Sequence, residues 1–147
     1  MKQLNDEYKE RLRDKIIEEA AKTPLNEYLG IEMVELDEEH GIGRVKNRPE
    51  VLNPYGSYHG GALLAFADVV AGVTGFMISG CYVTTISQTL NFMLPAMNTE
   101  YVYCEAKVLR AGKHIQVFEV KITDDDGKLL DSGEYSFFLT NRRVLGE

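Results

Sequence analysis

The spacing of apolar residues changes along the chain, and each change marks a predicted element. Residues 5–22 are highly charged, and apolar side chains recur at every fourth position through this segment and just before it. These apolar residues are Leu4, Tyr8, Leu12 and Ile16. The spacing predicts an amphipathic surface helix, which ends at Thr23-Pro24 because the residue before a proline disfavours helical backbone angles.

Two short strands are predicted next, over residues 29–36 and 42–48, joined by a turn-rich segment at 37–41. Residues 53–56, with the sequence Asn-Pro-Tyr-Gly, have the composition of a loop.

The following stretch, residues 60–80, is nearly uncharged and about as long as a membrane span. Asp68 is its only charged residue, and the stretch holds five glycines. Because it stands alone in a short acidic chain, we interpret it as one fully buried helix, from about His59 to Ser79, in a protein that does not enter a membrane.

After this helix the pattern has a period of two, which predicts strands. Four strands are expected at residues 82–93, 101–108, 115–123 and 129–139, with turns at 111–113 and 125–127. A helix that is apolar on all sides must be covered on all sides, so the sequence predicts an α+β fold with a curved antiparallel sheet wrapped on one central helix. Six strands cannot close around that helix, so a partner surface in a dimer is also expected.

Composition narrows the function. The 147 residues suit one domain, which we place at residues 25–147, after an N-terminal amphipathic helix at 1–24. A net charge of −7 argues against nucleic-acid binding. Two cysteines without metal-ligand spacing predict neither a disulfide framework nor a metal site. The charged N-terminus lacks the apolar segment of a signal peptide, so we expect a cytoplasmic protein.

Candidate chemistry lies on the long helix. Gly60 and Gly61 stand at its start, where backbone N–H groups lack intrahelical partners and the helix dipole is positive. Such an end can hold an oxyanion, although the glycines can equally serve close packing against a strand. Asp68 lies further along among apolar residues, and burial should raise its pKa toward the range useful for a general base. A structural role for this carboxylate is the competing interpretation.

These residues resemble the signature of the PaaI-type hotdog thioesterases, in the 4-hydroxybenzoyl-CoA thioesterase superfamily. The resembling pattern is Asn53-x-x-Gly56-x-x-His59-Gly60-Gly61, followed by Asp68 nine residues after the histidine. The resemblance covers about residues 25–140, including TISQTLNFMLPA at 85–96, VLRAGK at 108–113 and DGKLLDSG at 126–133. It implies the hotdog fold, active sites at a dimer interface, assembly into dimers or tetramers, and hydrolysis of acyl-CoA to a free acid and coenzyme A. Coenzyme A enters only as part of the substrate, and no other cofactor is implied.

The resemblance also implies roles for single residues. Asp68 would activate water or attack the thioester carbonyl itself, and the sequence leaves both open. The N–H of Gly60, with that of Gly61, would hold the oxyanion. His59 and Asn53 would orient the thioester and shape the loop.

The resemblance implies roles at further positions, and each of these residues also has a purely structural interpretation. Thr85 stands where the family places a hydroxyl that helps to hold the attacking water, although strands use threonine freely. Four residues near one hairpin would meet the phosphates of coenzyme A, or form a solvated hairpin tip: Lys107, Arg110, Lys113 and His114. Tyr58 replaces a smaller apolar residue and would narrow the site.

Two other functions remain open from the sequence. One is a hotdog domain that binds acyl-CoA without turnover, as a sensor or scaffold. The buried carboxylate beside a carbonyl-binding helix end favours the enzyme over this module. The other is a dehydratase that uses His59 and Asp68 as an acid–base pair, but their placement fits the thioesterase pattern better.

Overall fold

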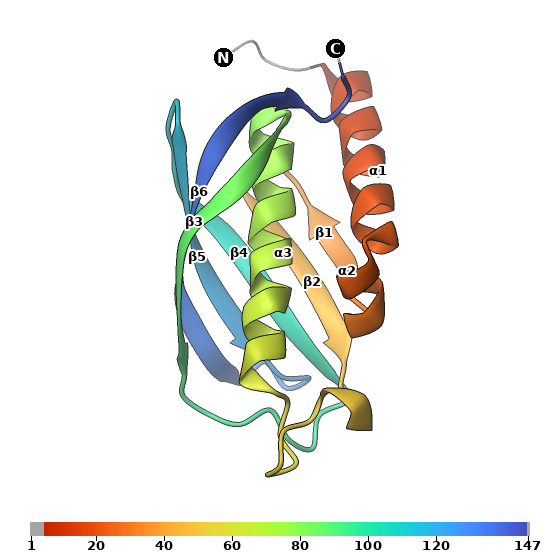
Figure 1. The fold of residues 1–147 in the computed structure, drawn as a ribbon, viewed down its shortest axis with the longest axis vertical. Helices are drawn as coiled ribbons and strands as arrows, with labels where there is room; N and C mark the ends of the chain where they lie inside the picture. The colour runs from red at the N-terminus through yellow and green to blue at the C-terminus, as the bar shows by residue number, and fades with distance from the viewer. Residues whose placement is uncertain (1–4, 147) are drawn as a thin grey trace.

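The elements follow one another as the sequence predicts, with a helix, two strands, a long helix and four strands (Figure 1). The structure is a computed structural model that describes residues 5–146. The helices are α1 (Asp6–Lys22), α2 (Pro24–Leu29) and α3 (Gly60–Ser79), with one 3₁₀ turn, η1 (Pro49–Val51). The strands are β1 (Glu32–Leu36), β2 (His40–Lys46), β3 (Cys81–Phe92), β4 (Tyr101–Ala111), β5 (Ile115–Thr123) and β6 (Leu129–Arg143).

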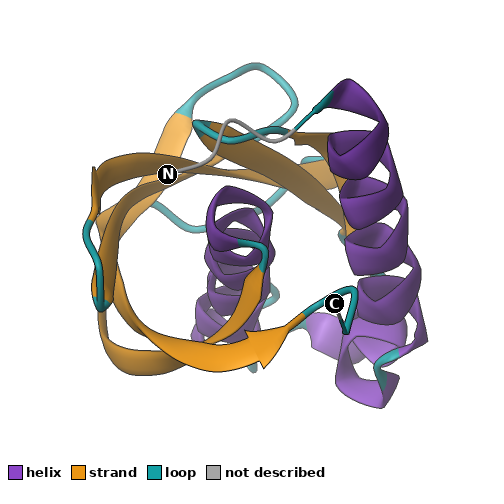
Figure 2. Ribbon diagram, turned by 90° about the horizontal axis from the view of Figure 1, so that it is seen from above, coloured by secondary structure: helices purple, strands orange, loops and turns teal. Residues whose placement is uncertain are grey.

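All six strands form one antiparallel sheet in the order β1-β2-β4-β5-β6-β3. The sheet curls around α3, so that the helix lies inside its concave face (Figures 1 and 2). The predicted α+β hotdog architecture is confirmed. Strand β3 pairs only with β6 and is therefore an edge of the sheet.

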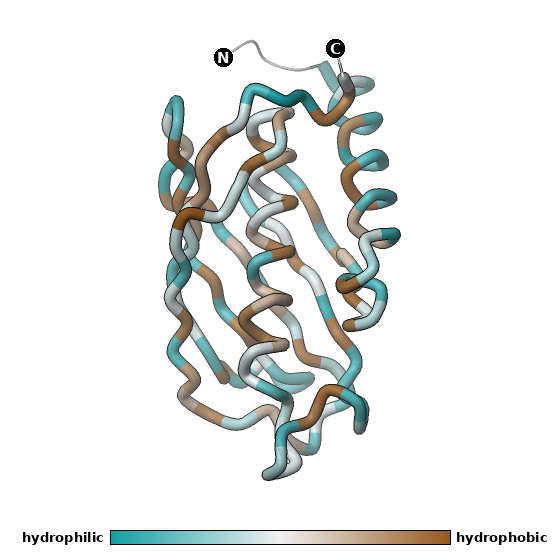
Figure 3. Tube along the Cα trace, viewed as in Figure 1, coloured by the Kyte–Doolittle hydropathy of each residue, from teal (hydrophilic) through white to brown (hydrophobic). Residues whose placement is uncertain are grey.

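Helix α3 supplies the centre of the core. Many of its residues, including Phe66 and Val70, are buried in the main core cluster with residues of the sheet, and apolar positions recur along this helix (Figure 3). Gly43 on β2 allows the helix to come close, because a Cβ there would lie 2.7 Å from Val70 Cγ2. By length and composition α3 could cross a membrane, but 56% of its most apolar window is buried within this fold, as expected for a core helix.

Helix α1 covers the side of α3 that the sheet leaves open (Figure 2). Leu12 and Ile16 are buried against Val73 and Met77 of α3, which confirms the predicted apolar stripe. The Asn5 side chain accepts a hydrogen bond from Tyr8 N–H at 2.8 Å and caps the helix. Leu4, the first residue of the predicted series, lies outside the described residues. The division of the chain at residue 24 stays a prediction.

The predicted start of the first strand, at residue 29, was wrong. Pro24 begins a further short helix, α2, since the fixed backbone angle of proline suits a first helical position. Leu29 ends that helix and Gly30, with φ of 72°, turns the chain before β1 begins at residue 32. Other boundaries also moved: β2 covers residues 40–46 rather than 42–48, β4 continues three residues beyond the predicted end at 108, and β6 continues four residues beyond the predicted end at 139.

Candidate active site

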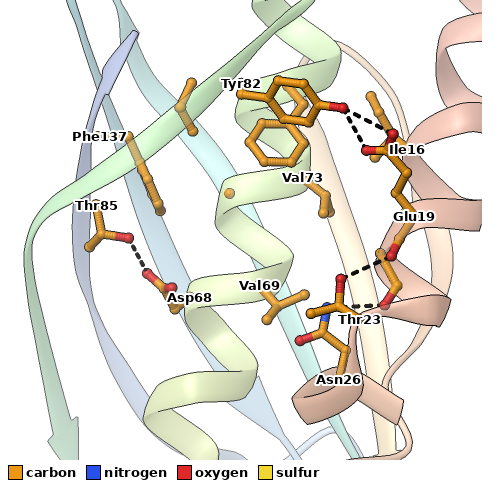
Figure 4. A pocket seen from close by; sticks show the side chains of 14 residues that line it. Ile16, Glu19, Thr23, Asn26, Asp68, Val69, Val73, Tyr82, Thr85 and Phe137 are labelled. Carbon is orange, nitrogen blue, oxygen red and sulfur yellow. Dashed lines mark hydrogen bonds between the residues drawn. The ribbon is translucent and has the colours of Figure 1, made fainter. Parts of the chain in front are cut away.

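Asp68 lies in the middle of α3, and Thr85 of β3 lies opposite it (Figure 4). Gly80, with φ of 71°, reverses the chain after α3, so that β3 runs back along the helix. This brings Thr85 level with Asp68, where Thr85 Oγ1 donates a hydrogen bond to Asp68 Oδ1 at 2.7 Å. The structure thus joins two residues that the resemblance placed together.

The Asp68 carboxylate is half-buried on an apolar helix. Burial raises its pKa above the ordinary value, and the bond from Thr85 opposes that rise only in part. The second oxygen, Oδ2, accepts no hydrogen bond from any residue between 5 and 146. A carboxylate with one oxygen held and one oxygen open can take a proton from water or attack a carbonyl.

A cavity of about 360 Å³ lies beside this pair, between α1, α3 and β3 (Figure 4). Asp68 and Thr85 form one end together with Phe137, and the apolar side chains of Val69 and Val73 line the middle (Figure 4). The wall on the other side comes from helices α1 and α2 and from the start of β3: Ile16, Glu19, Ala20, Thr23, Asn26 and Tyr82.

The pattern of residues along the chain does not predict this wall. Tyr82 donates a hydrogen bond from its hydroxyl to Glu19 Oε2 at 2.7 Å and so ties β3 to α1. Its ring also packs edge-on against Phe76 of α3, with centroids 5.2 Å apart. Residues 19 and 82 are far apart in the chain, and only the packing of α1 on the domain brings them together.

The N-terminus of α3 is built around His59. This residue caps the helix, and its Nδ1 accepts a hydrogen bond from Gly61 N–H at 3.0 Å. The Gly60 N–H donates to no group of residues 5–146. Of the two donors predicted for an oxyanion, the structure therefore leaves that of Gly60 open to a ligand.

Asn53 shapes the loop that leads into this helix. Its Oδ1 accepts hydrogen bonds from Tyr55 N–H at 2.9 Å and from Ser57 N–H at 3.1 Å. Its Nδ2 donates to Ser57 Oγ at 2.8 Å. These bonds fix the turn just before His59, so Asn53 supports the helix N-terminus from within the loop.

A second cavity, of about 310 Å³, opens at this end of α3. It is lined by the loop before the helix, by Gly60 and Leu63, by the chain after β3, and by Asp131 of β6. Asp131 is only 1% exposed, and burial raises its pKa to about 6. The sequence analysis missed this residue. A signal was present, because Asp131 is in phase with the inward-facing Tyr135 and Phe137 on the same strand.

One chain does not bring all the predicted residues to one point. Asp68 lines the first cavity and Gly60 lines the second. Eight residues of helix separate them, which is a rise of about 12 Å at 1.5 Å per residue. A carboxylate and an oxyanion donor that act on the same carbonyl must both lie about 3 Å from the reacting group.

The four basic residues predicted to meet coenzyme A phosphates lie on and around the β4–β5 hairpin. Lys107, Arg110, Lys113 and His114 are all exposed. The hairpin is at the end of the sheet near which α3 ends (Figure 1), and none of the four lines either cavity. Within the described part of the chain, no group of three or more His, Cys, Asp or Glu could hold a metal ion, and Cys81 and Cys104 are free thiols.

Comparison with known proteins places this architecture in a family. The sequence profile of the Thioesterase superfamily matches residues 55–130, just over half of the 147-residue chain. The chain is 28% identical over 107 residues to a 1,4-dihydroxy-2-naphthoyl-CoA hydrolase of Listeria monocytogenes, covering 72% of this chain and 87% of that protein. It is 26% identical over 100 residues to the acyl-coenzyme A thioesterase PaaI of Escherichia coli, covering 68% and 71%.

Solved structures share the fold. The structure of E. coli PaaI superposes with a TM-score of 0.80 at 20% identity, over 90% of this chain and 98% of that one. A thioesterase of Haemophilus influenzae superposes with a TM-score of 0.78 at 20% identity, over 98% of this chain and 94% of that one. The chain belongs to the Thioesterase superfamily, and it shares the hotdog fold of these structures.

Proposed function

We propose that this thioester hydrolase acts on acyl-CoA thioesters and releases the free acid and coenzyme A. The observation that carries the proposal is the half-buried Asp68, which lines a cavity and whose Oδ1 is held by Thr85, while Oδ2 has no hydrogen-bond partner among residues 5–146. Membership of the superfamily supports it. So do two relatives, one a naphthoyl-CoA hydrolase and the other an acyl-coenzyme A thioesterase.

Asp68 can act by either of two routes. As a general base, Oδ2 takes a proton from a water molecule while the water oxygen attacks the thioester carbonyl, and the tetrahedral intermediate then expels the thiolate of coenzyme A. As a nucleophile, Oδ2 attacks the carbonyl, the thiolate leaves, and water hydrolyses the resulting anhydride. In both routes the hydrogen bond from Thr85 fixes the direction of the carboxylate.

The Gly60 N–H is the proposed donor to the thioester oxygen as it becomes negatively charged. It stands at the positive end of the helix dipole, where an anion is stabilised. His59 contributes indirectly, because its ring occupies the neighbouring Gly61 N–H and fixes the first turn of the helix. His59 and Asn53 are therefore proposed as positioning residues rather than as the base.

A second copy of the chain is needed to complete such a site. Asp68 and Gly60 of one chain are about 12 Å apart along α3, too far to act on one carbonyl. Strand β3 is an edge strand of 12 residues, and its segment from Thr84 to Thr89 is exposed. Long free edges in native proteins are normally covered, so we propose a dimer in which two β3 strands meet and each α3 supplies its N-terminus to the partner's Asp68.

Three expectations stay predictions beside this proposal. They are the contact of Lys107, Arg110, Lys113 and His114 with coenzyme A phosphates, the pairing of dimers into tetramers, and a cytoplasmic location. The first would require the hairpin of one chain to reach a site formed with another chain, since none of these residues lines a cavity in its own.

The test is thiol release from a panel of acyl-CoA esters, from short aliphatic through aromatic to long chain. The wild-type protein and Asp68→Asn are compared, with Asp126→Asn as the matched control, because Asp126 is exposed on the β5–β6 hairpin and lines neither cavity. We expect hydrolysis of at least one ester, abolished in Asp68→Asn and retained in the control. Binding of acyl-CoA without release of thiol from any ester would instead favour a non-catalytic binding module.

A further inference from the structure

Asp131 is a buried carboxylate that the proposed mechanism does not use. Its side chain is 1% exposed, and neither carboxylate oxygen accepts a hydrogen bond within residues 5–146. Burial raises the pKa of Asp131, and the nearby Met93 N–H lowers it in part. That N–H donates its hydrogen bond to the Leu130 carbonyl at 3.0 Å. A buried charge without a partner is costly, so the protein retains an unfavourable group at this position.

No basic side chain compensates for this carboxylate. The titratable groups that act on Asp131, or are acted on by it, are Cys104 and Tyr135, and neither carries positive charge. The residues that line the cavity beside Asp131 include no lysine, arginine or histidine. Among the residues that the structure describes, Asp131 therefore has no basic partner.

The position itself suits an apolar residue. Asp131 pairs with Phe92 of β3 and with the fully buried Ile122 of β5, so an aliphatic side chain would suit this position. A polar group kept at such a point, against the stability of the fold, is a common feature of functional sites.

A second unsatisfied group faces the same cavity. The hydroxyl of Tyr58 is buried and has no hydrogen-bond partner in the described residues, and burial raises its pKa to about 12. The cavity also reaches Gly60, whose open N–H is the proposed site of the thioester oxygen. Its remaining walls are largely apolar, from Leu63, Phe92 and Leu94.

We propose that Asp131 is a specificity-determining residue, which accepts a hydrogen bond from a hydroxyl group on the acyl part of the thioester, held in the cavity beside Gly60. The inference rests on the proposed function and names the chemical class of its acyl group. The phosphates of coenzyme A are excluded from this cavity, because an uncompensated carboxylate repels them. A neutral hydroxyl can donate a hydrogen bond to the carboxylate without bringing a second charge between the largely apolar walls of this cavity.

The consequence for catalysis is that the enzyme should discriminate between acyl groups with and without this hydroxyl. An acyl group without the hydroxyl leaves Asp131 buried and unpaired in the complex, whereas a hydroxylated acyl group satisfies it. Sites built to bond a substrate hydroxyl reject the analogue that lacks it far more strongly than apolar pockets reject a change in size.

The experiment measures kcat/KM for matched pairs of esters. Butyryl-CoA is compared with 3-hydroxybutyryl-CoA, and benzoyl-CoA with its 2-, 3- and 4-hydroxy derivatives. In the wild-type protein we expect at least one hydroxylated ester to exceed its parent by about tenfold or more. In Asp131→Leu we expect that ratio to fall to within about twofold of one, with Asp131→Asn between the two because its amide oxygen still accepts a hydrogen bond.

The inference is overturned by equal kcat/KM for every pair in the wild-type protein, or by a ratio that survives in Asp131→Leu. A loss that is the same for parent and hydroxylated esters would assign Asp131 to the pantetheine arm or to the fold, and would also overturn it. If Asp131→Leu does not fold, the ratio in Asp131→Asn decides, and an unchanged ratio counts against the inference.

Failure of the proposed function is distinguishable from failure of this inference. If no ester is hydrolysed, the proposed function fails, and equilibrium binding of the same pairs to the wild-type protein and to Asp131→Asn takes the place of kinetics. Tighter binding of a hydroxylated ester that is lost in the variant supports the role of Asp131. Equal dissociation constants within every pair overturn it.

Discussion

Thr85 Oγ1 donates a hydrogen bond to Asp68 Oδ1 at 2.7 Å, and this bond joins the edge strand of the sheet to the middle of the central helix. It occupies one carboxylate oxygen of Asp68, a residue that lines a cavity, and leaves the other without a hydrogen-bond partner in the described residues. It also stabilises the ionised form of Asp68, against the effect of burial on the pKa.

Removing that bond should move the pH profile. In Thr85→Val the pKa of Asp68 loses the contribution that lowers it. Since Asp68 must be ionised to act, the acidic limb of the kcat profile should move to higher pH, and kcat at neutral pH should fall about 10- to 100-fold. Thr123→Val on β5 is the control, because Thr123 lines neither cavity. An acidic limb that stays in place, or that moves to lower pH, would remove Thr85 from the site.

Asp131 should make the stability of the protein depend on pH. Its folded pKa of about 6 is above its ordinary value, so the folded state binds the proton more tightly than the unfolded state. The contribution to stability is therefore full at pH 4 and below and is lost as the pH rises through about 6. Asp131→Asn cannot ionise, so at pH 7.5 it should be more stable than the wild-type protein by about 1–3 kcal/mol.

Urea unfolding at several pH values measures this difference. The advantage of Asp131→Asn should shrink steadily between pH 7 and pH 4. A variant that is less stable than the wild-type protein at pH 7.5 would mean that the fold itself satisfies the Asp131 carboxylate.

The bond from Tyr82 to Glu19 should hold α1 on the domain. Tyr82→Phe keeps the ring against Phe76 and removes only the hydroxyl that bonds the carboxylate. We expect a loss of about 1–3 kcal/mol in the free energy of unfolding, as for a hydrogen bond to a charged group. Tyr28→Phe is the control, because Tyr28 is 58% exposed. Equal stability of the two variants would show that apolar packing alone holds α1.

The exposed edge strand should carry the dimer contact. Ile86 on β3 is 53% exposed, and Leu109 on β4 has the same exposed fraction. Ile86→Lys would bring two like charges together across a β3–β3 contact, so light scattering should show monomers, and kcat/KM should fall at least tenfold. Leu109→Lys should remain dimeric and active. A monomeric wild-type protein with full activity would contradict the proposed assembly.

The sequence predicted the features that depend on local pattern. The uncharged run around Asp68 predicts the central helix, and the period of two after it predicts all four strands of the second half. Asp68 and Gly60 belong to a spaced motif, whereas Thr85 came from the resemblance of the strand at residues 85–96. The structure accounts for Thr85 because β3 folds back along α3 and brings its hydroxyl to Asp68.

Most of the features that the sequence did not predict depend on contacts between residues that are far apart in the chain. The short helix after Pro24 is six residues long, too short to show a helical period. Glu19 and Tyr82 meet only because α1 docks on the open side of the sheet. Asp131 is conspicuous only when its neighbours are known to be buried, since an aspartate after two leucines near a turn has an ordinary composition.

The central claim is that Asp68 of one chain and Gly60 of another act on the same thioester, and subunit mixing tests it most directly. Asp68→Asn lacks the carboxylate, and Gly60→Val covers the helix end with a side chain that has room beside Phe92, 3.4 Å from the new Cβ. Each variant alone should be inactive. A dimer with one chain of each kind keeps one intact site, so unfolding and refolding an equal mixture should restore about a quarter of the wild-type activity. A mixture that forms mixed dimers and stays inactive would contradict the account.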